Sequence, residues 1–188
     1  AGSDNAFGAT ISYPNDLIDA SLSYKHIGRE FTPSLGFVPR TGVQIWQLQA
    51  ALQPRPTGKL IRQMIFEFNP ILVTDLGGRW ESYRLEAKPL DWELRSGDRF
   101  ELNIVPEGDR PGEAFDVFTS DTKTVTVPAG SYNWNRVEIQ GALADKRRIS
   151  GEATWSTGGF YGGHLTSLDV RLAVKPSTFL SLELGLER

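Results

Sequence analysis

The residues best placed to do chemistry are four carboxylates close together in the chain, Glu107, Asp109, Glu113 and Asp116. They belong to a proline- and glycine-containing acidic stretch over residues 106–120, which we expect to be the one long loop of the chain. Carboxylate oxygens are ligands that calcium prefers, so calcium is the one cofactor that the sequence suggests. The spacing is not that of an EF-hand, however, and the plainer interpretation is an acidic loop solvated by water.

Catalytic patterns are weak. Glycoside hydrolysis needs two carboxylates across a cleft, and Asp98 and Glu101 are the nearest pair, but a spacing of three on a strand places them on opposite faces. We instead expect Asp98 to be a turn residue after Gly97. His26 and His164 lie far apart, and neither accompanies a nucleophile motif. The sequence therefore predicts no catalytic residue, and a glycoside hydrolase stays only as a third hypothesis.

Composition excludes several classes of protein. Charged residues make up 23% of the chain, the net charge is -3, and lysines and arginines are scattered singly, so the basic patch that nucleic acid requires is missing. There are no cysteines, and hence neither disulfides nor cysteine-ligated metals. No apolar stretch approaches the roughly 20 residues of a membrane-spanning helix, although this does not exclude a membrane β-barrel.

The elements that must position any site are strands. Residues 132–188 alternate between apolar and polar residues in four successive runs, which places one apolar and one charged face on a large antiparallel sheet. The charges that we expect on the polar face, which would line the interior of a barrel, are Arg136, Glu138, Arg148, Glu152, Asp169, Arg171 and Glu183.

Upstream, nearly every segment also reads as strand, separated by turns rich in proline and glycine, and no window has the periodicity of a helix. Lys88-Pro89 is expected to break one strand from the next. Residues 158–163 predict a hairpin, with a ligand-binding lip of exposed aromatics as the alternative. The predicted fold is an all-β antiparallel up-and-down β-barrel, or part of one, with a β-sandwich as the alternative. We expect residues 1–188 to form a single domain, a fragment of a longer chain with neither a signal peptide at its start nor a last strand at its end.

Three segments carry a family resemblance. Residues 31–40 resemble a "dF-x-P-x-x-GFv-x-R" segment, and residues 94–132 resemble "L-x-x-GD-x-x-E … pFei … v-iPaGsY". Residues 158–163, followed by 175–177, resemble "G-x-fY-gG … rPs". In this order they resemble a bacterial family of unknown function, in which a carbohydrate-binding family 9-like module usually precedes a predicted outer-membrane β-barrel. The module is absent here, so its sugar binding does not carry over, and the family has no catalytic motif.

Whether the sheet meets lipid or water decides the function. Strands of about 9–11 residues, aromatics near strand ends and mixed charges on one face favour a membrane barrel. Arg62, which lies amid apolar neighbours, weighs against it. Together with the family resemblance, which implies a bacterial outer membrane and a link to carbohydrate, the first hypothesis is a non-enzymatic structural or transport segment of a bacterial outer-membrane β-barrel, with lipid as partner. The alternative is a soluble, periplasmic or secreted β-sandwich that binds glycans by stacking sugars on aromatic side chains, the candidates being Trp80, Trp92, Trp134, Trp155 and Tyr161.

Overall fold

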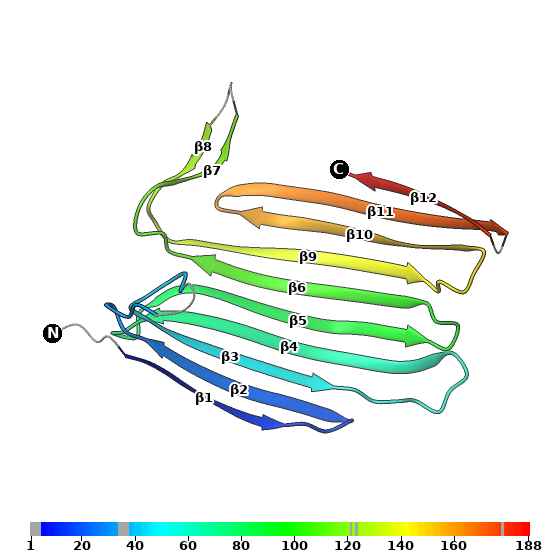
Figure 1. Ribbon diagram of the computed structural model, residues 1–188, viewed down its shortest axis with the longest axis horizontal. Helices are drawn as coiled ribbons and strands as arrows, with labels where there is room; N and C mark the ends of the chain where they lie inside the picture. Colours follow the sequence, from blue (N-terminus) through cyan, green and yellow to red (C-terminus); the bar gives the residue numbers. More distant parts are fainter. Residues whose placement is uncertain (1–4, 34–37, 121, 123, 178) are drawn as a thin grey trace.

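The structure, a computed structural model, describes residues 5–33, 38–120, 122, 124–177 and 179–188. Ten of its twelve strands form one antiparallel sheet, and two form a separate hairpin (Figure 1). The strands are β1 (Ala6–Tyr13), β2 (Ile18–Ile27), β3 (Val43–Leu52), β4 (Ile61–Asp75), β5 (Trp80–Leu94), β6 (Arg99–Asp109), β7 (Phe115–Thr119), β8 (Thr124–Val127), β9 (Tyr132–Leu143), β10 (Ile149–Phe160), β11 (Gly163–Ser177) and β12 (Leu180–Glu187).

The sheet is an up-and-down meander in which each strand pairs with its neighbour in the chain, apart from the β7–β8 hairpin inserted between β6 and β9. The all-β antiparallel prediction is confirmed. The sheet is open rather than closed into a barrel, because β1 pairs only with β2 and β12 only with β11. No second large sheet stacks on it within the described residues, so the alternative of a β-sandwich is not what this chain forms.

Register assigns the paired residues of the ten-stranded sheet to one of two faces, because directly paired residues point to the same side. One face, the apolar face, carries a continuous set such as Leu22, Leu72, Ile139 and Leu184. Of the large hydrophobic side chains in this sheet that are more than a third exposed, all except Phe160 and Leu165 lie on it. They are Phe7, Ile11, Tyr13, Ile18, Leu22, Trp46, Leu52, Phe68, Leu72, Phe100, Ile104, Ile139, Leu143, Ile149, Trp155, Leu172, Leu180, Leu182, Leu184 and Leu186.

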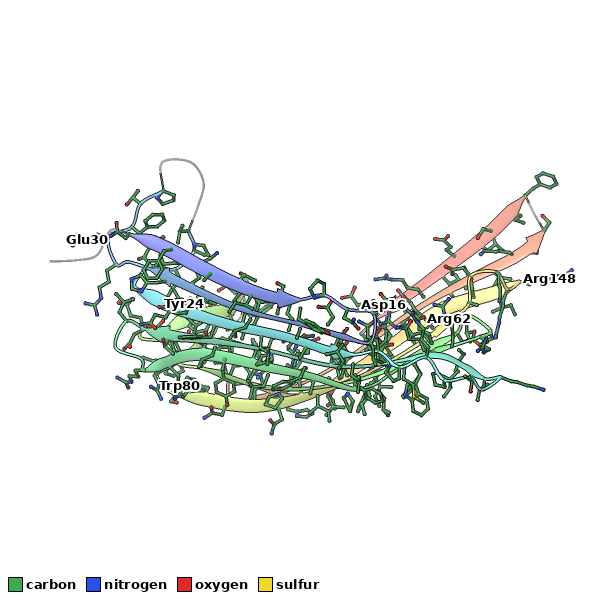
Figure 2. The ribbon with its side chains drawn as sticks, turned by 90° about the horizontal axis from the view of Figure 1, so that it is seen from below. Asp16, Tyr24, Glu30, Arg62, Trp80 and Arg148 are labelled. Atoms are coloured by element: carbon green, nitrogen blue, oxygen red, sulfur yellow. The ribbon has the colours of Figure 1, made fainter. Side chains whose placement is uncertain are left out.

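The opposite face, the charged face, is the more buried one. Asp91 is 1% exposed and Glu101 5%, whereas Leu184 on the apolar face is 69% exposed. Figure 2 shows the sheet curved, with both margins raised above the middle strands. Side chains converge on the concave side of a curved sheet and spread apart on its convex side, so these burials make the charged face the concave one. Exposed apolar and buried charged side chains reverse the usual order of a soluble protein.

The two ends of the sheet differ. At one end, residues 14–17, 53–60, 95–98 and 144–148 connect the strands by short segments. At the other end lie the longer connections 28–42 and 110–131, the second of which carries the β7–β8 hairpin away from the sheet (Figure 1). We call this second end the hairpin end.

Aromatic residues mark both borders of the apolar face. Near the hairpin end Tyr24, Trp46, Leu72 and Tyr83 are successive register partners across four strands, and the Tyr24 and Trp46 rings are 4.4 Å apart. Near the other end Trp92 pairs with Phe100. The nine residue-to-residue steps from Tyr83 to Trp92 span about 30 Å along the strand, or about 23 Å along the normal at a tilt of about 40°. That height matches the apolar band between the aromatic girdles of membrane barrels.

Two predicted boundaries are wrong. Lys88-Pro89 does not end a strand: β5 runs through it by a bulge, because the register shifts between Ala87 and Leu90. Residues 106–109 likewise belong to β6 rather than to a loop, although Pro106 and Gly108 resemble turn chemistry. Within the first segment of the family resemblance, residues 34–37 lie outside the described residues.

Candidate functional site

The candidate site is the charged face, where the sheet collects side chains of both signs. Of the seven charges predicted there, six lie on β9 to β12 and point to this face, while Arg148 lies in the turn before β10, at the far end of the sheet (Figure 2). The carboxylates placed on this face by register are Asp19, Glu67, Asp75, Glu86, Asp91, Glu93, Glu101, Glu107, Asp109, Glu138, Glu152, Asp169, Glu183 and Glu187. The cations are Lys25, Arg84, Lys88, Arg99, Arg136 and Arg171.

The most buried charges lie on β5 and β6. Asp91 accepts two hydrogen bonds from the Arg99 guanidinium, at 2.8 and 2.6 Å, and Arg99 also lies 3.0 Å from Glu101. Lys88, at the β5 bulge, is 3.4 Å from both Glu67 and Glu101. The bulge gives one extra residue on this face and so lets one ammonium reach carboxylates on both neighbouring strands. Buried carboxylates require such partners, since removing one partner would leave an uncompensated charge.

A groove of about 660 Å³ lies on the charged face near the short connections. Arg62 lines it and pairs with Glu93. The register shift between Ile61 and Gln63 turns Arg62 out of the apolar alternation. The position of Arg62 therefore does not place a charge on the apolar face.

An aromatic cluster lies at the hairpin end of the charged face. Tyr161 contacts Phe115, Tyr132, Trp134 and Phe160, with ring centroids 4.8 to 5.4 Å apart. It forms a two-residue hairpin turn with Gly162 in which both φ angles are positive, 47° and 94°. This confirms the hairpin predicted for residues 158–163. A tyrosine in the left-handed region is unusual, and its ring contacts help to hold it there.

The Tyr161 hydroxyl donates a 2.5 Å hydrogen bond to Asp109 on β6. Burial, followed by this bond and the Asp109 charge, raises the pKa of Tyr161 to about 12 from 10.0. A phenol whose pKa is raised on folding contributes stability that is complete below pH 10 and lost as the pH rises toward 12.

We therefore expect Tyr161→Phe to lower the free energy of unfolding by about 1 kcal/mol at pH 8. Urea unfolding of the wild type and the variant, followed by tryptophan fluorescence from pH 8 to 12, should show two stabilities that converge at the alkaline end. If the difference in free energy of unfolding between the wild type and the variant stayed constant across this pH range, the phenol proton would not be what stabilises the turn.

The predicted stacking aromatics are divided between the faces. Trp134 and Tyr161 share the aromatic cluster, where Trp134 Nε1 also donates to Glu107 at 2.9 Å. Trp92 and Trp155 lie on the apolar face. Trp80, at the start of β5 (Figure 2), has the Arg110 guanidinium 3.9 Å from its ring centroid. The five rings therefore do not form one binding platform.

The candidate calcium ligands are separated in the same way. Glu107 and Asp109 lie in β6, where Glu107 is 2.5 Å from Arg84 and 3.4 Å from Arg136. Asp116 lies in β7 and accepts from Thr126, and Glu113 precedes that strand. No group of three or more histidine, cysteine or acidic side chains able to hold a metal occurs in the described ranges.

Asp98 and Glu101 do not form a catalytic pair. Asp98 lies in the β5–β6 turn, where it accepts from the Ala144 amide at 3.0 Å, pairs with Arg147 and bonds Ser96. The hydrogen bonds that Asp98 accepts from the Ala144 amide and the Ser96 hydroxyl lower the pKa of this carboxylate. This carboxylate therefore joins two turns at the end of the sheet, while Glu101 is engaged with Lys88 and Arg99. Of the histidines, His26 stacks on Phe7 and His164 hydrogen-bonds Thr157.

Sequence reasoning missed the charges of β4 to β6, which are the most buried of the face. A signal was present, since Glu101, Asn103, Glu107 and Asp109 alternate with apolar or small residues. Pro106 and Gly108, which resemble turn residues, obscured it.

No protein-family model, curated protein or solved structure matches the chain. The described residues contain no helix long and apolar enough to cross a membrane.

Proposed function

We propose that this chain forms part of the wall of a bacterial outer-membrane β-barrel, with a structural or transport role and no enzymatic activity of its own. The apolar face contacts lipid, and the charged face lines an aqueous interior. The observation that carries the proposal is the apolar face, which has exposed large hydrophobic side chains on nine of the ten strands of the sheet, all except β5.

The area of the apolar face indicates whether lipid or water contacts it. Ten strands about 4.8 Å apart and a band about 25 Å high give an apolar surface of about 1,200 Å². The largest apolar patch on a typical soluble monomer is about 300–600 Å². Within the described part of the chain, no helix or second large sheet covers the face. Lipid accounts for a surface of this size and uniformity.

The free edges fit the same proposal. Unpaired backbone groups cannot remain in hydrocarbon, so a membrane sheet must close. An up-and-down sheet with an even number of strands has antiparallel first and last members, and β1 and β12 are both eight residues long. β1 carries neither charge nor proline, which are the devices that protect the edge strands of soluble sheets. We infer that both edges are paired in the membrane, either with each other or through an even number of further strands.

The bacterial outer membrane and the link to carbohydrate enter through the family resemblance of the three segments. Two of its motifs fall on features that shape the barrel wall: the Tyr161–Gly162 turn and the β5–β6 hairpin.

A scan of single cysteines along β11 tests which face meets lipid. The chain has no cysteine, so each introduced thiol is the only one present. In lipid vesicles, cysteines at Ser167, Asp169 and Arg171 should react with a water-soluble maleimide, and those at Leu168, Val170 and Leu172 should not. Lys146→Cys, in an exposed turn, is the control that reacts throughout. Reactivity without a two-residue period would contradict the proposal.

A further inference from the structure

The charged face contains an acidic row that crosses seven strands. From β4 to β12, the successive register partners are Ile65, Asp91, Glu101, Gln140, Thr154, Asp169 and Glu187. Four of the seven are carboxylates and none is a cation. Because register partners lie side by side across a sheet, the row becomes a band around the interior once the sheet is closed.

Cations from neighbouring rows only partly neutralise this band. Arg99 pairs with both Asp91 and Glu101, and Lys88, which lies 3.4 Å from Glu101, lies equally close to Glu67 outside the row. Arg171 lies 3.5 Å from Asp169 but also 2.9 Å from Glu152. Among the described residues, no cation lies within ion-pair distance of Glu187, nor of Glu138 or Glu183 on the same face. Carboxylates therefore exceed cations along the interior.

An independent observation lies beside the row. Asn103 is only 6% exposed, and its amide nitrogen donates to Glu101 at 2.7 Å and to Glu138 at 3.2 Å. These two acceptors fix the orientation of the amide, which leaves Oδ1 buried without a partner among the described residues. Asn103 and Glu138 line a space of about 50 Å³. An orphan acceptor oxygen beside a carboxylate provides ligands for a small cation or for its hydration water.

Taking the barrel proposed above as its basis, we propose that the charged face makes the interior selective for small cations over anions. A low-dielectric wall focuses the field of charges that line a cleft, and lipid on the apolar face supplies such a wall. Rings of carboxylates favour cations in this way in channels. The acidic row is the part of the face that determines the selectivity.

The test is the reversal potential of the full chain in a planar lipid bilayer under a KCl gradient. The permeability ratio of K⁺ to Cl⁻ should exceed one. Asp169→Asn and Glu187→Gln should each move the ratio toward one, whereas Arg171→Gln should raise it. Ser12→Ala, a neutral change on β1 of the same face, is the matched control and should leave the ratio unchanged.

A ratio at or below one, or carboxylate and Arg171 variants that shift it in the same direction, would overturn the cation preference. Insertion into vesicles without any conductance would overturn it too, because a sealed interior selects nothing. Failure of the chain to insert would instead reject the proposed barrel wall, so the two failures are distinguishable.

Discussion

Val170→Arg should abolish stable insertion of the chain into lipid. Val170 is the central residue of β11 and lies on the apolar face between Ala153 of β10 and Leu186 of β12. An arginine on the lipid side at the bilayer midplane costs about 2–4 kcal/mol. Since about 1.4 kcal/mol is a factor of ten, the inserted fraction should fall by a factor of about 30 or more. Flotation with lipid vesicles measures that fraction directly.

The matched control is the adjacent residue on the opposite face. Asp169→Asn removes a charge from a half-exposed, mixed-charge position beside Arg171, and insertion should be nearly unchanged. If both variants floated equally well, or both failed to float, the assignment of the two faces to lipid and water would be wrong.

Gly158→Ala should destabilise the sheet where β9 pairs with β10. Gly158 has a φ angle of 155°, which side chains rarely adopt, and a Cβ there would lie 2.6 Å from the Arg136 Cα and would also clash with the Asn135 carbonyl. Both obstacles are backbone, so neither can rotate away. We expect a loss of about 3 kcal/mol in the free energy of unfolding, measured by urea titration of the refolded protein.

Gly141→Ala provides the comparison. Gly141 lies on the neighbouring strand β9, a Cβ at this position would meet nothing within 4 Å, and its φ is not positive. This alanine should be neutral or should stabilise the protein by about 0.5 kcal/mol. If both alanines lowered the free energy of unfolding equally, the close approach of β9 and β10 at Gly158 would not be the cause of the destabilisation.

The architecture was readable where alternation runs uninterrupted. Residues 132–188 contain β9 to β12 almost as predicted, because a two-residue period fixes both the strand and its faces. The errors share one cause. Lys88-Pro89, Pro106 and Arg62 all lie where a bulge or a proline interrupts the local pattern, whereas the partner strands maintain the sheet. The local residue pattern does not indicate which distant strands pair with these segments.

The candidate site shows the same limit. Alternation was sufficient to place Glu138, Glu152 and Asp169 on one face. The acidic row, however, depends on register between strands far apart in the chain, such as Glu101 beside Gln140. Neither the unpaired oxygen of Asn103 nor the ring contacts of Tyr161 can be read from spacing, because both arise from packing across strands.

The most direct test of the central claim is the state of the purified chain with and without lipid. The protein should aggregate in plain buffer and become a β-rich monomer by circular dichroism in detergent micelles or lipid vesicles, because the apolar face has no cover of its own. A stable β-rich monomer in plain buffer would contradict the barrel wall, since so large an exposed apolar surface could not remain in water.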